Sequence, residues 1–209
     1  MDLPKQFDTT SSRVIDDLKV TLKKGSKVSM AAASFSLFAF EALKKELENI
    51  DELRFIFTSP TFIKDKAKKE KREFYIPKLN RERTLYGSDF EIKLRNKLSQ
   101  KAIARECAEW IRRKVKFKSN VSKMNMPGFL NVTNDDGLST YMPFNEFTTT
   151  ELGCERGNSL MQLIQKFPSP FSDAYLRNFN DFWQDKDGFA DVTESIIENI
   201  ENVYRENSP

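Results

Sequence analysis

The chain has 209 residues, of which 39% are hydrophobic and 31% are charged, and its formal net charge is only +3. A chain of this length can bury a core without disulfides, and Cys107 and Cys154 match neither a disulfide framework nor a metal-ligand spacing. No apolar run approaches the roughly 20 residues that span a bilayer, and the N-terminus lacks the pattern of a secretory signal. We therefore expect a cytoplasmic globular domain with no membrane partner, metal or cofactor.

The first 63 residues are predicted to alternate between helix and strand. Hydroxyl groups at residues 10–12 can cap a first helix, and residues 27–33 (KVSMAAA) are typical of a buried strand. Ser36 can cap a second helix that continues to Glu48, and residues 53–58 (LRFIFT) form a second strand. The apolar stripe of the first helix consists of Val14, Leu18, Val20 and Leu22. This order favours a parallel sheet covered by helices.

Charge is distributed unevenly along the chain. Residues 64–118 carry nineteen basic and eight acidic side chains, a net charge of +11. Residues 119–209 carry six basic and fourteen acidic side chains, a net charge of −8. A segment as basic as the first can attract an anionic partner although the whole protein is nearly neutral. The alternative is a solvated, lysine-rich surface that pairs with the acidic C-terminal third of the same chain.

A long helix is predicted within the basic segment. Ser88 and Glu91 form an S-x-x-E capping box, and apolar residues at helical spacing continue to about Lys114. Basic residues recur every four positions on one face of this helix, and more follow at its end. We predict that a nucleic-acid-binding surface is formed by Lys93, Lys97, Lys101, Arg105, Arg112, Arg113 and Lys116. Such a surface would contact backbone phosphates, so its affinity would depend on salt and little on sequence.

Strands are predicted next, followed by helices. Residues 115–119 alternate in polarity, and residues 127–133 and 138–143 form two strands joined by a turn that contains Asp-Gly. Helices are expected at residues 172–183 and from Asp191 almost to the last residue. The expected fold is α/β, with one mixed central sheet flanked by helices.

The segment that follows the hairpin carries a family motif. Residues 142–153 read MPFNEFTTTELG, and Phe179 and Trp183 follow as an F-x-x-x-W pair. The order of elements and these residues resemble the phospholipase-D-like nuclease family, whose second hairpin strand ends in G-S-x-N-x-T-x-x-x-L. The corresponding positions here are Asn145, Thr148 and Leu152. The resemblance implies a phospholipase-D-like sandwich.

The catalytic strand of that family is altered in this chain. Where the family carries H-x-K, the chain has Met126-Pro127-Gly128, and it contains no histidine. The family's mechanism needs one imidazole as nucleophile and another to protonate the leaving oxygen, and neither methionine nor proline can replace them. We therefore predict a degenerate pocket, without catalytic residues, formed by Met126, Gly128, Asn145 and Thr148. The last two residues are interpreted either as phosphate ligands or as a turn and a helix cap.

Longer stretches resemble the N-terminal region of large bacterial Swi/Snf-type helicases of the DEAD/DEAH class. They include GSKVSMAAASFSLFAFEALKKEL, ELRFIFTSPTFIK and FTTTELGCERGN, and the likeness extends over nearly the whole chain. It implies a phospholipase-D-like domain at residues 1–190 and a terminal helix at residues 191–209 that leads toward a helicase motor in the same polypeptide. The chain has no G-x-x-x-x-G-K-[ST] loop, so it is not the ATP-dependent motor itself.

Three functions remain open from the sequence. The first is an inactive nuclease-like accessory domain that binds DNA for an attached helicase. The second is a protein-interaction or dimerisation module, whose expected sign is an exposed apolar patch. The third is an enzyme with other chemistry, either with Cys154 as nucleophile or as a metal-dependent nuclease. The acidic residues proposed for a metal are Asp135, Asp136, Glu146, Glu151 and Glu155.

Overall fold

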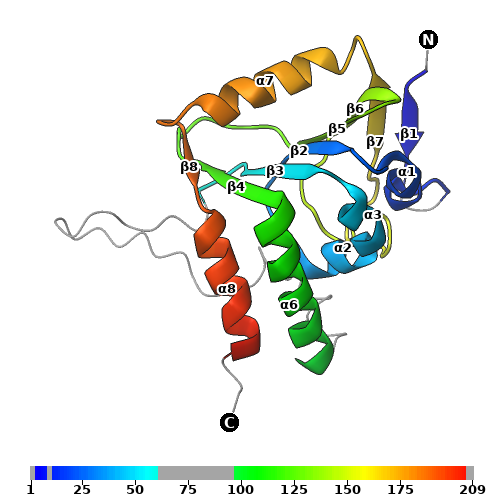
Figure 1. Ribbon diagram of the computed structural model, residues 1–209. Coiled ribbons are helices and arrows are strands. Elements are labelled where there is room, and N and C mark those ends of the chain that lie inside the picture. The colour runs from blue at the N-terminus through cyan, green and yellow to red at the C-terminus, as the bar shows by residue number, and fades with distance from the viewer. Residues whose placement is uncertain (1–2, 9–10, 61–96, 206–209) are drawn as a thin grey trace.

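Figure 1 shows the computed structural model of the chain, in which one sheet lies between two layers of helices. The structure describes residues 3–8, 11–60 and 97–205, and for residues 97–99 the backbone alone. Within these ranges eight strands form the sheet, in the order β1-β7-β6-β5-β2-β3-β4-β8. The strands are β1 (Lys5–Phe7), β2 (Lys27–Ala32), β3 (Glu52–Phe57), β4 (Val115–Asn120), β5 (Phe129–Asn134), β6 (Gly137–Met142), β7 (Ile164–Pro168) and β8 (Phe189–Asp191).

The sheet is mixed, as the sequence predicts. β3 pairs with β2 and with β4 in parallel, and the other neighbouring strands are antiparallel. The five predicted strands correspond to β2 through β6 and lie next to one another in the sheet. The expected α/β fold, with one mixed sheet flanked by helices, is therefore confirmed.

Helices cover both faces of this sheet unequally (Figure 1). One face packs against α1 (Val14–Thr21), α2 (Leu37–Ala42), α3 (Lys44–Asn49), α6 (Lys97–Lys114) and α8 (Thr193–Arg205). The other face packs against α7 (Asp173–Gln184). The core of the first face contains a phenylalanine cluster, in which the Phe35 ring lies edge-on to Phe55 and Phe117 with centroids 5.7 and 5.3 Å away. Such pairs add to the free energy gained by burying the rings.

Two predicted helices differ in detail from those observed. The Ser36 hydroxyl accepts the backbone N–H groups of Phe38 and Ala39, which confirms the cap, but the helix breaks at Leu43 into α2 and α3. In α1 the side chain of Val20 is 65% exposed, because Ile15 instead completes the buried stripe at helical spacing. The capping box at residues 88–91 lies outside the described residues.

The last helix belongs to the same core as the first five elements of the chain. Ile196, Ile197 and Ile200 of α8 are buried in the cluster that also holds Trp110 and Ile111 of α6. The Asp191 carboxylate, at the end of β8, accepts the N–H of Thr193 and so starts the helix. In the part of the chain that the structure describes, no helix is both long and apolar enough to cross a membrane.

Candidate functional site

The position of the family's H-x-K lysine is closed by backbone. Gly128 directly precedes β5, and its carbonyl oxygen accepts the N–H of Phe144 at 3.0 Å. A Cβ atom at residue 128 would lie 2.2 Å from the Phe144 carbonyl oxygen and 2.9 Å from the Asn145 Cα. Backbone atoms cannot rotate away as a flexible side chain can, so only glycine fits. The site cannot carry a lysine in this backbone conformation.

Three members of the predicted pocket, Gly128, Asn145 and Thr148, lie close together, but their polar groups are used by hydrogen bonds within the fold. The backbone of Asn145 is held on both sides, because its N–H donates to Glu151 Oε1 and its carbonyl accepts the N–H of Ala33, each at 2.8 Å. The buried Thr148 hydroxyl accepts the N–H of Glu151 at 3.1 Å and caps a turn. Met126 packs toward α7. Gly128 and Asn145 are thus adjacent, and Thr148 already uses its oxygen inside the fold.

Glu151 is a titratable group of this region whose surroundings the sequence does not reveal. Burial raises the pKa of Glu151 to about 7, although the N–H of Asn145 acts in the opposite direction. Its second carboxylate oxygen accepts a hydrogen bond from Gln162 Nε2 at 2.5 Å. This carboxyl group, with its raised pKa, therefore lies beside Asn145 and Thr148.

The acidic residues proposed for a metal lie apart. Asp135 and Asp136 form the turn between β5 and β6, and Asp136 pairs with Lys23. Glu146 and Glu151 follow the opposite end of β6. Within the described ranges no three histidine, cysteine, aspartate or glutamate side chains come together as a metal site.

Cys154 also lacks the surroundings of a reactive nucleophile. Burial raises the pKa of the Cys154 thiol, whereas an activated cysteine has a lowered pKa. The charge of Arg13 acts the other way but is the smaller influence. At neutral pH the thiol form therefore predominates.

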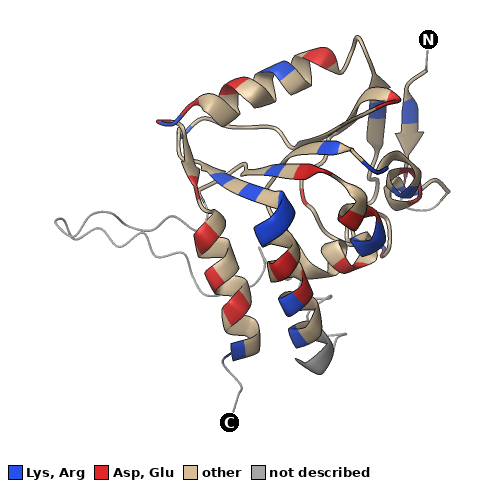
Figure 2. Cartoon of the chain, viewed as in Figure 1, with Lys and Arg blue, Asp and Glu red and all other residues tan. Residues whose placement is uncertain are grey.

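Two of the predicted nucleic-acid-binding residues, Arg105 and Arg112, contact residues of α8. Arg112 forms an ion pair with Glu201, and Glu201 also pairs with Arg205 at 2.8 Å. The Arg105 guanidinium lies 5.7 Å from the centre of the Tyr204 ring. Figure 2 shows acidic positions along α8, which lies beside α6, and both acidic and basic positions along α6. Part of the basic segment is therefore paired with the acidic C-terminal third.

The remaining predicted residues point in other directions or lie outside the described part. Arg113 donates to Glu48 of α3 at 3.0 Å, and Lys116 belongs to β4, on the sheet face toward α7. Lys101 is half-buried on α6. Lys93 and the side chain of Lys97 are outside the described residues. The described members of the surface are thus divided among three sides of the molecule.

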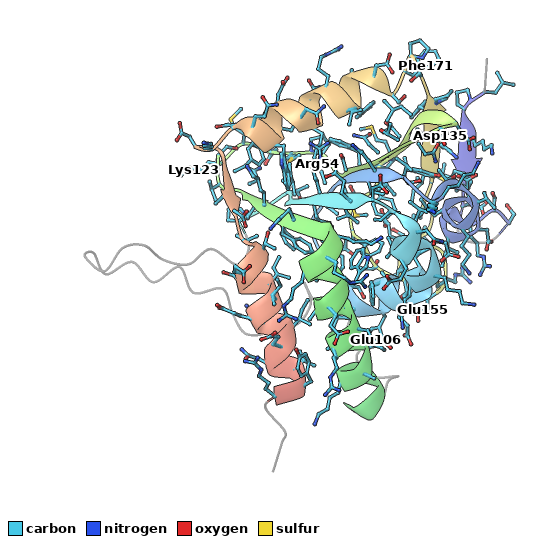
Figure 3. The ribbon with its side chains drawn as sticks, viewed as in Figure 1. Arg54, Glu106, Lys123, Asp135, Glu155 and Phe171 are labelled. Carbon is cyan, nitrogen blue, oxygen red and sulfur yellow. The ribbon has the colours of Figure 1, made fainter. Side chains whose placement is uncertain are left out.

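A second polar cluster lies between α7 and the sheet, and the sequence analysis does not single it out. Arg54 of β3 donates from Nη2 to Ser29 Oγ and to Asn180 Oδ1 of α7, both at 2.9 Å. Its guanidinium lies 5.1 Å from the centre of the Phe179 ring and 5.7 Å from that of Trp183. Figure 3 shows Arg54 in this position, between β3 and α7. Burial lowers the pKa of Arg54. The only sequence signal is one basic residue within the apolar strand LRFIFT.

No protein-family model and no curated protein sequence matches this chain. Among solved structures, the chain is similar in fold to two kinds of enzyme at low sequence identity. Yeast tyrosyl-DNA phosphodiesterase aligns with a TM-score of 0.43 at 13% identity, over 95% of this chain and 41% of that enzyme's chain. Phosphatidylserine synthase of Haemophilus influenzae aligns with a TM-score of 0.46 at 10% identity, over 97% and 43% of the two chains. The chain spans about two fifths of the length of these enzymes, and a likeness of this degree says nothing of activity.

Proposed function

We propose that this chain is a non-catalytic domain with a phospholipase-D-like fold. The observation that carries the proposal is the contact between Gly128 and the Phe144 carbonyl, which leaves no room for a lysine. The chain also contains no histidine, so it has neither the family's nucleophile nor its general acid. Without these groups, a phosphodiester bound beside Asn145 would meet nothing that attacks phosphorus by the family's route.

The test is a hydrolysis assay with purified chain. Substrates are bis(p-nitrophenyl) phosphate and single- and double-stranded DNA, each with magnesium, with manganese and with a chelator. We expect no product above a heat-denatured control. Metal-dependent cleavage that disappears when Asp135 and Asp136 are changed to Ala would contradict the proposal and support a metal-dependent nuclease.

The partner that we propose is DNA, presented to a helicase motor in the same polypeptide. Two observations support it: the net charge of +11 in residues 64–118, and the resemblance to the N-terminal region of Swi/Snf-type helicases. The ion pairs of Arg112 and Arg113 oppose binding, because each arginine must separate from its own carboxylate before it can meet a phosphate. We therefore expect weak, salt-dependent binding that varies little among sequences.

A fluorescence titration of mixed-sequence DNA tests this partner. Each lysine that contacts a phosphate releases about one counterion, so changing Lys97 and Lys101 to Glu should reduce the slope of log affinity against log salt by roughly 2. The matched control changes Lys24 and Lys45, exposed lysines outside the basic segment, to Glu. Absence of binding by the wild-type chain at low salt would remove DNA as the partner.

One observation favours a protein-interaction module as the second candidate. Leu160 and Met161 are consecutive, apolar and exposed, at 107% and 74% of their reference surface areas. Exposed apolar neighbours are the expected sign of a docking surface. Light scattering over a range of concentrations tests self-association, and changing both residues to Ser should abolish it. A monomer at all concentrations would remove the homodimer.

A further inference from the structure

Four polar side chains form a row across the sheet on the face toward α7. Ser29 of β2 is in register with Arg54 of β3 on one side and with Asn131 of β5 on the other, and Asn131 is in register with Thr140 of β6. Residues in register on neighbouring strands lie on the same face, about 5 Å apart. Apolar residues such as Ile56 and Phe129 lie beside the row on the same face. The row is therefore a polar band beside an apolar cluster on the face toward α7.

The band contains more hydrogen-bond donors than acceptors. Asn131 is 1% exposed, and its Oδ1 accepts the Thr140 hydroxyl at 2.6 Å while its Nδ2 is buried without a partner. The Nε atom of Arg54 is likewise buried without a partner. A buried donor without an acceptor costs about 1–3 kcal/mol, so native proteins rarely keep two together. The band therefore offers two buried donors that could bind an acceptor.

Positive charge gathers at the same place. Arg54 forms no ion pair with any described residue, and Lys116, its neighbour in register on β4, is exposed and also without one. Lys118 follows on the same face, where its Nζ donates to the Trp183 carbonyl at 2.6 Å and lies 5.1 Å from the Trp183 ring. The nearest carboxylate acting on Arg54 is that of Glu52. Lys118 has the Asp191 carboxylate in register beside it on β8, whereas Arg54 and Lys116 form no ion pair within the described part of the chain.

We propose that α7 and the neighbouring strands β5, β2, β3 and β4 form a binding site for a phosphate-like oxyanion. Arg54 donates charge-assisted hydrogen bonds to it, Lys116 attracts it at the rim, and the Asn131 amide is the donor in the interior. A water molecule would satisfy two donors but would leave the half-buried guanidinium without a counter-charge, whereas an oxyanion does both. Stacking on Phe179 and Trp183 holds the guanidinium plane in place, which favours bidentate recognition of two oxygen atoms of one anion.

The site is separate from the altered family motif. Ser29 and Arg54 lie in the middle of β2 and β3, and Asn131 lies inside β5, whereas Gly128 and Asn145 lie beyond the ends of β5 and β6. The proposal does not depend on DNA binding through α6, because no residue of α6 belongs to the band. The two proposals can therefore fail independently.

Titration with inorganic phosphate, followed by nuclear magnetic resonance of the ¹⁵N-labelled chain, tests the site. We expect saturable shifts of the Arg54 Nε–H and Asn131 Nδ2–H signals. Arg54→Gln should weaken binding by about tenfold or more, the factor that loss of one charge-assisted hydrogen bond predicts. Lys116→Gln, at an exposed position that leaves the fold intact, should weaken it by a smaller factor. Asn131→Asp should abolish it, because the new carboxylate takes the place of the oxyanion.

Lys45→Gln is the matched control, since Lys45 is an exposed lysine on α3, across the sheet from α7. It should bind phosphate like the wild-type chain, and so should the variant in which Lys97 and Lys101 are Glu. Short single-stranded DNA that displaces phosphate from Arg54 would identify a nucleic-acid phosphate as the source, and DNA that does not would identify a free phosphate. Unsaturable shifts, or equal affinity in the Lys116→Gln and Asn131→Asp variants, would overturn the proposal.

Discussion

Glu151 and Asp17 respond to pH in opposite ways because their partners differ. Burial raises the pKa of Glu151 to about 7, so between about pH 4.5 and 7 the folded chain binds a proton that the unfolded chain has released. Asp17 of α1 is held by Lys166 of β7 and the Tyr141 hydroxyl of β6, at 2.8 and 2.6 Å. Although burial opposes it, these hydrogen bonds lower the pKa of Asp17.

Glu151→Gln should stabilise the chain above pH 7. The folded wild type gives up its extra proton as pH rises through about 7, so the free energy of unfolding contributed by Glu151 falls between about pH 4.5 and 7. Glutamine carries no charge and avoids this loss. The free energy of unfolding of the variant should therefore exceed that of the wild type by up to about 3 kcal/mol at pH 8 and by almost nothing at pH 4. Urea unfolding at both pH values measures the difference. A variant with the same pH dependence as the wild type would show that Glu151 is not the group concerned.

Asp17→Asn should destabilise the chain at neutral pH by about 2–4 kcal/mol, because it leaves the partly buried Lys166 ammonium without its counter-charge. The lowered pKa of Asp17 means that this stabilisation is present above the ordinary aspartate range and is lost as pH falls through and below it. The loss in the variant should therefore shrink in acid. The control is Asp16→Asn, an exposed partner of Arg13, which should cost less than about 1 kcal/mol. Equal losses in the two variants would contradict the network.

Gly128→Ala should destabilise the chain by roughly 3 kcal/mol or more, because the added methyl group meets the fixed Phe144 carbonyl at 2.2 Å. Gly157→Ala is the control, since its added methyl group meets the Thr150 side chain, which can move. Thermal unfolding of the two variants separates a backbone clash from a general effect of alanine. A Gly128→Ala chain as stable as the wild type would show that the position can open, and it would weaken the case for inactivity.

At the level of elements, the contact between α6 and α8 decides how much of the basic segment is free. Glu201 of α8 pairs with Arg112 of α6, and the same carboxylate pairs with Arg205. A phosphate that approaches Arg112 therefore competes with a carboxylate already in place. The acidic helix limits the access of anions to this side of α6.

Glu201→Gln should therefore increase the affinity of the chain for DNA at low salt. The variant leaves Arg112 without its ion pair, and it adds one counterion-releasing contact, which steepens the salt dependence by roughly 0.9. Glu194→Gln removes the same charge from an exposed position at the start of α8 and serves as the control. Fluorescence titration of both variants measures the difference. Equal gains would show that net charge, and not the pair with Arg112, is responsible.

For the whole molecule, the predictable part of the fold is its centre. Strands β2 to β6 have six residues each, long enough for burial and turn signals to show in the sequence. β1 and β8 have three residues each, too few to reveal a period of two, and β7 contains Lys166 and ends at Pro168, which are unusual inside a sheet. These outer strands form only because their neighbours offer backbone hydrogen-bonding groups, which no local pattern records.

The candidate site, like the fold, is predictable from the sequence only in part. The absence of histidine is visible in the sequence and needs no structure to interpret. The direction of the basic side chains is not visible in the sequence. Helical spacing groups Arg105 and Arg112 on one face but does not show that α8 lies against that face. The polar band is less predictable still, because Ser29, Arg54 and Asn131 are far apart in sequence and meet only through strand register.

The two edges of the sheet bear on how the chain avoids aggregation. A sheet edge offers unpaired N–H and C=O groups to strands of other molecules, and short edge strands reduce that risk. Here the three residues of β1 cover β7 and the three of β8 cover β4. If β8 frays, the exposed edge becomes the six residues of β4, with Val115 and Phe117 on one face and two lysines on the other. Those lysines then repel β4 of a second molecule. The positive charges on the face toward α7 therefore also protect the sheet from aggregation when β8 separates from it.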